Sequence, residues 1–186
     1  MKNDLRREAF VRTANDLFST RGIAHTSIQD ITEQAGVTRS LFYHYFENKQ
    51  SIIDAVIDYR VDEYFNYIIV WSKGHKGLPV EKKLVGFSHV TRGVLQSPNS
   101  LFSQIVRERD STLYHRFAVR CASVLAAHFV SAKGQKGSLI ELSEARYPKE
   151  SFYVLAVGIV SLILEQPDTS DQIIASLIAD ALQLRL

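Results

Sequence analysis

The sequence predicts an all-α protein of about nine helices, in which a small N-terminal head of three helices precedes a larger helical body. Apolar side chains recur at three- and four-residue spacing along most of the 186 residues, and no alternating pattern typical of strands persists anywhere. Only 9 glycines and 4 prolines interrupt these segments. The 46% hydrophobic and 23% charged fractions are ordinary for a folded domain, which excludes disorder as the dominant state.

The first four predicted helices follow from apolar spacing and from capping residues. In residues 5–21 the apolar positions form one helical face, and Gly22 suits the left-handed residue that closes a helix. Ser27 and Thr38 offer N-cap hydroxyls, and Asn48 offers an amide oxygen for the same role. We therefore expect helices over residues 5–21, 28–34, 38–45 and 48–72.

Prolines and glycines punctuate the rest of the chain. Pro79 can occupy the first turn of a helix, where its missing N–H costs nothing, and Gly134 follows a long apolar stripe. Residues 134–148 contain two glycines and mixed charge, a pattern that predicts a loop. We expect the remaining helices over residues 79–95, 101–106, 113–129, 149–165 and 170–184.

Composition and targeting signals exclude several classes of protein. The single cysteine, Cys121, excludes an internal disulfide framework and any zinc site with two or more thiolates, and its apolar neighbours predict a buried thiol. The N-terminus lacks the apolar core of a signal peptide. The longest uncharged apolar run, residues 152–164, has 13 residues, whereas a membrane-spanning helix needs ~20. We expect a cytoplasmic protein with no membrane anchor, no metal site and no cofactor.

The sequence carries none of the common catalytic signatures. It contains no G-x-S-x-G nucleophile elbow, no phosphate-cradling G-x-x-x-x-G-K-[ST] and no H-E-x-x-H. Its 6 histidines never recur at i, i+4, so a metal site would need tertiary assembly. We expect a protein that is not an enzyme; turnover of a bound ligand would establish the opposite.

The most informative segment is residues 22–53. Its pattern predicts a helix, a three-residue turn that contains Gly36, and a second helix, an arrangement that sets two helices at about 90–120°. The second helix can then lie in the major groove of DNA while the first crosses the phosphate backbone. In that helix Arg39 can bind guanine bidentately, Ser40 can bond to several base edges, and Leu41 can contact a thymine methyl group.

Hydroxyls, tyrosines and a lysine around this second helix are placed to hold phosphates, aided by helix N-termini. The full set of candidate DNA-binding residues is Thr26, Ser27, Gln29, Thr38, Arg39, Ser40, Leu41, Tyr43, His44, Tyr45 and Lys49. The alternatives are that Tyr43 and Tyr45 pack on the first helix and that Arg39 is merely solvated. Residues 1–50 carry 7 basic and 6 acidic side chains, so affinity must come from placed contacts rather than from bulk charge.

This segment resembles the TetR family of bacterial transcriptional regulators over residues 5–55. The matching residues are Gly22, Thr26, Ser27, Ile28, Ile31, Ala35, Gly36, Val37, Thr38, Phe42, Tyr43, His44, Tyr45, Phe46 and Lys49. The resemblance implies a DNA-binding domain over residues 1–47 and a ligand-binding and dimerisation domain over residues 48–186, whose last two helices pair across a dimer axis. The implied partners are a double-stranded DNA operator, a small-molecule effector of unknown identity and a second copy of the chain. The implied function is that of a repressor that binds a palindromic operator and is released by the effector.

Two positions depart from the family pattern. Thr32 stands where the family usually has alanine, so the small core must accept a hydroxyl. Ser40 stands where glycine is common, which can shift base preference. Together with the nearly neutral head, Ser40 leaves open a second interpretation: a helical module that binds a small molecule or a protein and has lost DNA binding.

Aromatic and basic residues of the body are candidates for a ligand site, because such sites are apolar cavities with a few polar groups. The candidates are Tyr64, Tyr67, Trp71, Phe87, Arg92, Phe102, Arg107, Tyr114 and Phe117. Each aromatic can equally belong to the plain core, and each arginine to the surface. The run 152–164 is apolar on every side of a helix and must be covered all round, so we expect it to pair across the homodimer axis together with the last helix.

Overall fold

The computed structural model describes residues 2–75, 77–97, 101–107, 110–134 and 138–184, without the side chains of residues 2–4, 106 and 107. These residues form ten helices, which confirms the all-α prediction. The helices are α1 (Lys2–Arg21), α2 (Ile28–Gln34), α3 (Arg39–Tyr45), α4 (Lys49–Gly74), α5 (Val80–Leu95), α6 (Leu101–Arg107), α7 (Ser111–Ser131), α8 (Leu139–Leu142), α9 (Pro148–Glu165) and α10 (Asp171–Leu182). Within the described ranges, no helix is both long and apolar enough to cross a bilayer.

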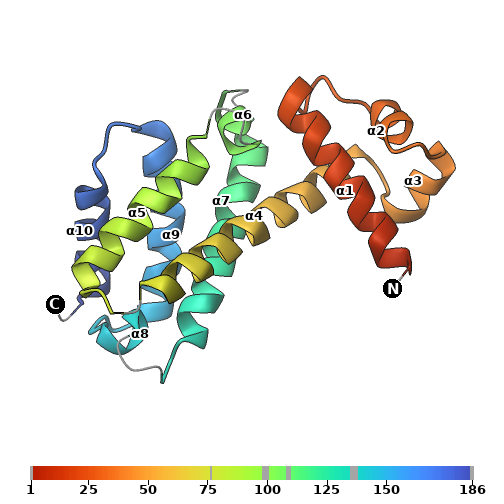
Figure 1. The fold of residues 1–186 in the computed structure, drawn as a ribbon. Coiled ribbons are helices and arrows are strands. Elements are labelled where there is room, and N and C mark those ends of the chain that lie inside the picture. The colour runs from red at the N-terminus through yellow and green to blue at the C-terminus, as the bar shows by residue number, and fades with distance from the viewer. Residues whose placement is uncertain (1, 76, 98–100, 108–109, 135–137, 185–186) are drawn as a thin grey trace.

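The head consists of α1, α2 and α3, and α4 begins beside it (Figure 1). Aromatic rings fill its centre: Phe10 of α1 meets Phe42 of α3 edge to face at a centroid distance of 5.7 Å, and Phe46 at 6.1 Å. Ile31 of α2 and Ile52 of α4 are fully buried in the same core. Burial of these side chains is the main force that holds three short helices together.

Capping groups determine where the head helices begin and end. The Ser27 hydroxyl accepts a hydrogen bond from the Asp30 backbone N–H at 3.1 Å, and the Asp30 carboxylate accepts one from the Ser27 N–H at 2.7 Å. The Ser27 hydroxyl also donates to the Asp30 carboxylate, and this bond, together with the one from the Ser27 N–H, holds the pKa of Asp30 below its ordinary value. Asn48 starts α4 with a capping box of the same kind. Gly22 follows α1 with φ of 90°, the left-handed conformation expected at this helix end.

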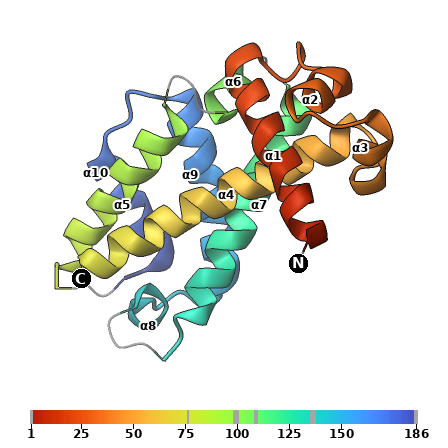
Figure 2. The same cartoon turned by 45° about the vertical axis from the view of Figure 1, so that its right-hand side comes forward.

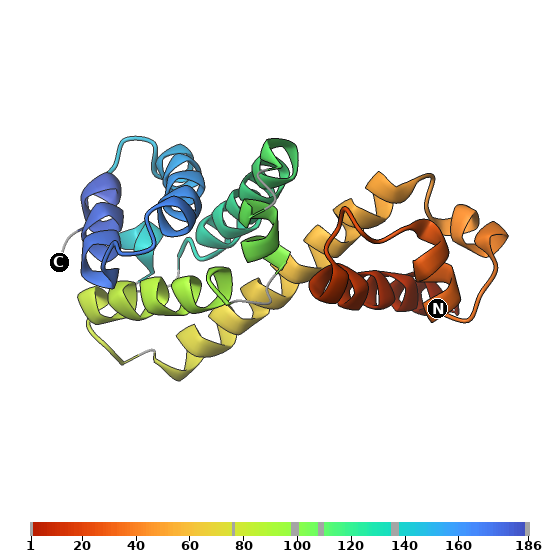
Figure 3. The same cartoon turned by 90° about the horizontal axis from the view of Figure 1, so that it is seen from above.

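Helix α4 connects the head to the body. Seen from above, the molecule has two lobes, and α4 runs from one into the other (Figure 3). Ile52 is buried near its start and Tyr64 toward its end. A second connection lies between α6 and the end of α1, where the Gln104 amide donates to the Ser19 carbonyl oxygen at 2.6 Å. A change in the body can therefore reach the head along one continuous helix.

The body is a bundle in which α7 lies against α9, α5 against α10, and α4 against both α5 and α7 (Figure 2). Two ion pairs one helical turn apart join α4 to α7. Asp54 pairs with Arg116 at 2.5 Å, and Asp58 pairs with Arg120 at 2.6 Å. These side chains are about half exposed, so they align the two helices more than they stabilise them.

The segment over residues 134–148, predicted as a loop, contains the short helix α8, so this part of the prediction was wrong. Four residues are too few to produce a periodic apolar pattern. Tertiary contacts order the segment instead: the Ser143 hydroxyl donates to the Leu182 carbonyl oxygen at 2.6 Å, and the Gly134 N–H donates to the Glu141 carboxylate at 2.7 Å.

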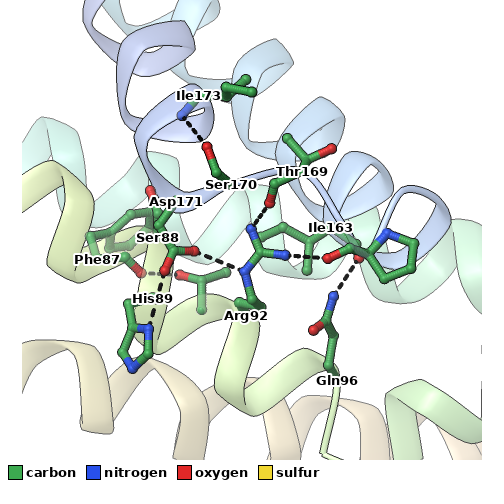
Figure 4. Close-up of polar contacts among 12 residues, drawn as sticks. Phe87, Ser88, His89, Arg92, Gln96, Ile163, Thr169, Ser170, Asp171 and Ile173 are labelled. Carbon is green, nitrogen blue, oxygen red and sulfur yellow. Dashed lines mark hydrogen bonds and ion pairs between the residues drawn. The ribbon is translucent and has the colours of Figure 1, made fainter.

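The side chain of Arg92, on α5, forms hydrogen bonds to the connection between α9 and α10 and to the start of α10 (Figure 4). Its Nε donates to the Asp171 carboxylate at 2.8 Å, and its other two nitrogens donate to the carbonyl oxygens of Pro167 and Thr169. The Arg92 and Asp171 side chains are only 17% and 18% exposed. The three bonds fix where α10 starts relative to α5.

Candidate nucleic-acid interface and body cavity

The turn between α2 and α3 is tightly specified. Gly36 has φ of 65°, a conformation in which any side chain is strained, so glycine is required here. The Val37 N–H donates to the Thr32 carbonyl oxygen at 3.0 Å and thereby closes the turn. Thr32 itself is buried, and its hydroxyl donates to the Gln29 carbonyl oxygen at 2.9 Å. The core thus accommodates the hydroxyl by bonding it within α2.

Helix α3 turns one face to the head and the other to solvent. Phe42 is fully buried, and Leu41 is half-buried against the same core. Four side chains of the helix are exposed, those of Arg39, Ser40, Tyr43 and His44. They form two adjacent pairs about one helical turn apart, so all four lie on a single helical face. Figure 1 shows α3 at the end of the head that is remote from the body. This face is free to approach a macromolecule.

An open hollow of about 400 Å³ lies beside this face. Its lining consists of Ala24, His25, Thr26, Ser27, Ile28, Arg39, Tyr43 and Lys49. The Lys49 ammonium group donates to the Ile23 carbonyl oxygen at 2.6 Å, which holds this cation in place. Two cationic side chains from different helices at one hollow suit an anion of phosphate size.

The remaining candidate DNA-binding residues have other roles in the head as well. The buried Thr26 hydroxyl donates to the Gly22 carbonyl oxygen at 2.8 Å, and Ser27 caps α2. Thr38 caps α3, and its hydroxyl accepts from the Leu41 N–H at 3.3 Å. Exposed Gln29 donates to the Glu33 carboxylate, and half-buried Tyr45 lies beside the rings of Phe10 and His44. The hydroxyls of Thr26, Ser27 and Thr38 bond within the head, so only some of the candidate residues have side chains that are free to contact DNA.

The body encloses a cavity of about 430 Å³ between α4, α5, α7, α8, α9 and α10. Its wall is mostly aliphatic and includes five aromatic rings, those of Phe65, Trp71, Phe87, Phe129 and Phe152. Phe129 and Phe152 stack on each other with centroids 4.3 Å apart, which joins α7 to α9. The volume lies in the lower part of the range typical of small-molecule sites.

The indole ring of Trp71 approaches α5 very closely. A Cβ atom at Gly86 would lie 2.3 Å from Cζ2 of Trp71, which no real contact permits. Glycine at this position therefore allows the ring to lie against the backbone of α5. Because Trp71 also lines the cavity, it fixes the distance between α4 and α5 at the cavity wall.

A comparison with known families identifies the head. Residues 10–56 match the family described as bacterial regulatory proteins, tetR family. The head of this chain is a TetR-family domain. The family is described as one of bacterial regulatory proteins.

Named relatives match segments of about a quarter to a third of the chain. The HTH-type transcriptional regulator TtgR of Pseudomonas putida is 40% identical over 52 residues, which are 28% of this chain and 25% of that protein. The HTH-type transcriptional repressor KstR2 of Rhodococcus jostii is 33% identical over 60 residues, 32% of this chain and 29% of that protein. The matched segment thus spans only a quarter to a third of these relatives.

Solved structures extend the TetR likeness to the whole fold. The crystal structure of RolR without ligand has a TM-score of 0.71 at 14% identity and covers 96% of this chain and 91% of that one. The structure of RolR in complex with resorcinol has a TM-score of 0.69 at 15% identity and covers 99% of this chain and 90% of that one. At such identities the likeness concerns the fold.

The TetR body does not bring all the candidate ligand residues together. Trp71 and Phe87 line the cavity, and the buried Tyr64 hydroxyl bonds to Thr91 of the cavity wall at 2.7 Å. The others do not line it: Phe102 stacks on Phe117, Tyr67 is 57% exposed, Arg92 fastens α10, and Tyr114 is half-buried on α7. The side chain of Arg107 lies outside the described residues.

The sequence reasoning missed the polar residues of the cavity, among them Lys83, His128 and Ser138. Lys83 stands in the first turn of α5, where a lysine is usually solvated, and no sequence signal distinguishes it from Lys82. His128 and Ser138 lie at the end of α7 and just before α8. Only the packing of these helix ends brings the three residues to one cavity.

Proposed function

We propose that the chain is a DNA-binding transcriptional regulator, in which residues 1–47 bind DNA and residues 48–186 bind a ligand and dimerise. The observation that carries the proposal is the exposed face of α3, with Arg39, Ser40, Tyr43 and His44 beside a hollow that contains Lys49. An exposed helix with polar and cationic residues at helical spacing suits a major groove. The names of TtgR and KstR2 support the same function, and that of KstR2 supports repression. Such a protein acts in the cytoplasm.

Within this proposal the residues divide into two kinds of contact. Arg39 and Ser40 read base edges, and Leu41 adds an apolar contact where its side chain emerges from the core. Lys49, Tyr43 and the backbone N–H groups around Ser27 hold phosphates. The last set positions the head on any duplex, whereas the first set selects a sequence.

Replacing Arg39 by alanine should weaken binding to the preferred duplex by about 1–3 kcal/mol and relax base preference at one position per half-site. Lys49→Ala should weaken binding to every sequence and make the salt dependence shallower, because one phosphate contact is lost. Fluorescence anisotropy on the preferred and on a random duplex, over a range of salt, measures both effects. Arg120→Ala, which removes the same charge from the body, is the control. Equal weakening of both duplexes by Arg39→Ala would contradict the base-reading role.

The proposed regulator is a two-fold dimer through α9 and α10 that binds a palindromic operator. Val154 on α9 and Ile173 and Leu177 on α10 are 70%, 54% and 43% exposed, although all three are large and apolar. Small residues, Gly158 and Ala181, are exposed on the same two helices and permit close approach of a partner. An isologous contact of this surface with itself covers the apolar side chains and presents two heads to successive major grooves.

The proposed effector binds in the body cavity and lowers DNA affinity through α4. Five residues of α4 line the cavity, namely Phe65, Ile68, Ile69, Trp71 and Ser72, and the same helix begins at Lys49 in the head. A ligand that fits one tilt of α4 better than another changes the separation of the two heads from the roughly 34–36 Å that successive grooves need. Coupling of about 1–3 kcal/mol changes DNA affinity roughly 5–150-fold. The resorcinol complex of RolR supports a small-molecule ligand for this fold.

A further inference from the structure

The polar residues of the body cavity define the charge of the molecule that it can accept. Among the described residues that line it, Lys83 is the one lysine or arginine, and none is an aspartate or glutamate. Within the described part of the chain, no ion pair involves Lys83. The side chain is half-buried, so its ammonium group is partly removed from water at the cavity wall. An anion would restore the interactions that this group loses.

Ser138 supplies a second observation that points to a ligand. Its hydroxyl oxygen is buried and has no hydrogen-bond partner among the residues that the structure describes, although Ser138 lines the cavity. The hydroxyl does not cap α8, which begins at the next residue. By contrast, the Thr91 hydroxyl of the same wall donates to the Phe87 carbonyl oxygen at 2.8 Å. A buried hydroxyl left without a partner is costly unless a bound molecule completes it.

His128 adds a neutral donor to this group. Partial burial lowers the pKa of the imidazole below its ordinary value, which favours the neutral ring with one N–H, although the residue as a whole is exposed. The Phe65 ring meets it edge to face at a centroid distance of 4.9 Å, which holds the imidazole at the wall. A neutral imidazole can donate its N–H to a carboxylate oxygen.

Three polar residues of the wall come from the ends of different helices and lie among apolar lining residues. Lys83 lies near the start of α5, His128 near the end of α7, and Ser138 just before α8. Figures 1 and 2 show these three helix ends at the same end of the body, beside α8. Apart from Ser72 and Thr91, the other described residues of the wall are aromatic or aliphatic, and they include Val160 of α9 and Ile178 of α10. The cavity is therefore amphipathic.

We propose that the cavity binds an amphipathic monocarboxylic acid, with the carboxylate on Lys83, His128 and Ser138 and the apolar tail among the aromatic rings. This inference rests on the proposed function in that it names the chemical class of the effector. The carboxylate gives Lys83 a counter-ion and gives the Ser138 hydroxyl an acceptor. The tail replaces water at an apolar wall, which supplies most of the affinity.

Trp71 makes the test direct, because it is the single tryptophan of the chain and lines the cavity. Tryptophan fluorescence and titration calorimetry are recorded with 4-phenylbutanoate and octanoate, each against its primary amide, which has the same shape without the charge. At least one acid should bind about tenfold or more tightly than its amide. Equal affinity of acid and amide in both pairs, or no binding by either acid, would overturn the proposal.

Lys83→Met keeps most of the side chain's length and removes its charge. It should lower acid affinity about tenfold and leave amide affinity unchanged, whereas Lys82→Met, at the exposed neighbouring position, should change neither. An acid preference that survives in Lys83→Met contradicts the assignment to Lys83. The comparison of acid with amide in the wild-type protein remains valid even if the variant folds poorly.

The same titrations with a DNA duplex bound separate this inference from the proposed function. Lys83-dependent binding of the acid with release of DNA supports both. If the acid binds with Lys83 dependence but DNA affinity is unchanged, the ligand class stands and release by the effector is wrong. If the protein binds no DNA at all, the regulator proposal fails while the ligand class is still decided by the acid and amide affinities.

Discussion

Leu177→Glu should convert the protein from a dimer to a monomer at micromolar concentration. Leu177 is 43% exposed on α10, and the proposed interface would bury it against the partner. In a symmetric dimer each copy then places one unpaired carboxylate in the interface. Each carboxylate costs about 3 kcal/mol of the free energy of association. The total of about 6 kcal/mol corresponds to a dissociation constant raised more than ten-thousand-fold. Sedimentation velocity measures the change in mass.

Val70→Glu is the matched control for this variant. Val70 is 69% exposed on α4, outside the proposed interface, so the same type of substitution should leave the dimer intact. Glutamate at Ile159 or Ile163 is a poorer test, because both residues are buried within the chain's own core and the change would disrupt folding. A monomeric wild-type protein, or a dimeric Leu177→Glu variant, would be incompatible with an interface through α9 and α10.

Arg92→Ala should lower the free energy of unfolding by about 2–4 kcal/mol. The substitution removes three charge-assisted hydrogen bonds and leaves the Asp171 carboxylate, 18% exposed, without its guanidinium partner. Arg92→Lys should lose less, because a lysine keeps the charge but cannot reach Asp171 and two carbonyls with a planar fork. Urea denaturation at one fixed protein concentration measures the free energy of unfolding of the wild-type protein and of each variant.

Arg116→Ala provides the comparison for this series. Arg116 also forms an ion pair with an aspartate, Asp54, at 2.5 Å, but the two side chains are 43% and 47% exposed. Exposed pairs of this kind contribute about 0–1 kcal/mol. If Arg92→Ala were no more destabilising than Arg116→Ala, the proposed role of Arg92 in fixing α10 would be wrong.

Local sequence signals were sufficient for most of the helices. Gly22 and Gly36 both have the positive φ values that their positions after α1 and α2 require, and Ser27 and Asn48 cap the helices expected to follow them. These features depend on neighbours a few residues away, so a single sequence contains them. Helix α8 escaped prediction because contacts with the distant residue Leu182 order its surroundings.

The body site was less predictable, because periodicity shows which side of a helix is apolar but not what that side meets. Phe102 and Phe117 have the same sequence signature as Phe87, yet they stack on each other with centroids 4.0 Å apart while Phe87 lines the cavity. Arg92 was a candidate for the ligand site, but its partner Asp171 lies 79 residues further along the chain. A local sequence pattern contains no information about which distant residues come into contact.

The head showed the same limit on a smaller scale. The spacing of Arg39, Ser40, Tyr43 and His44 was enough to expect one exposed face, and all four are exposed. The bond from the Thr26 hydroxyl to the Gly22 carbonyl oxygen could not be anticipated, since it depends on the path of the chain between α1 and α2. Which of these side chains meets DNA stays a prediction.

Binding of the wild-type protein to DNA fragments that flank its own gene is the most direct test of the central claim. The measurement is an electrophoretic mobility shift at low salt, where even non-specific complexes are strongest, followed by competition with random duplex as salt is raised. The account predicts a complex that persists on at least one fragment with an affinity roughly a thousandfold or more above that for random DNA. The absence of any complex at low salt would contradict it and favour a helical module that binds a small molecule without binding DNA.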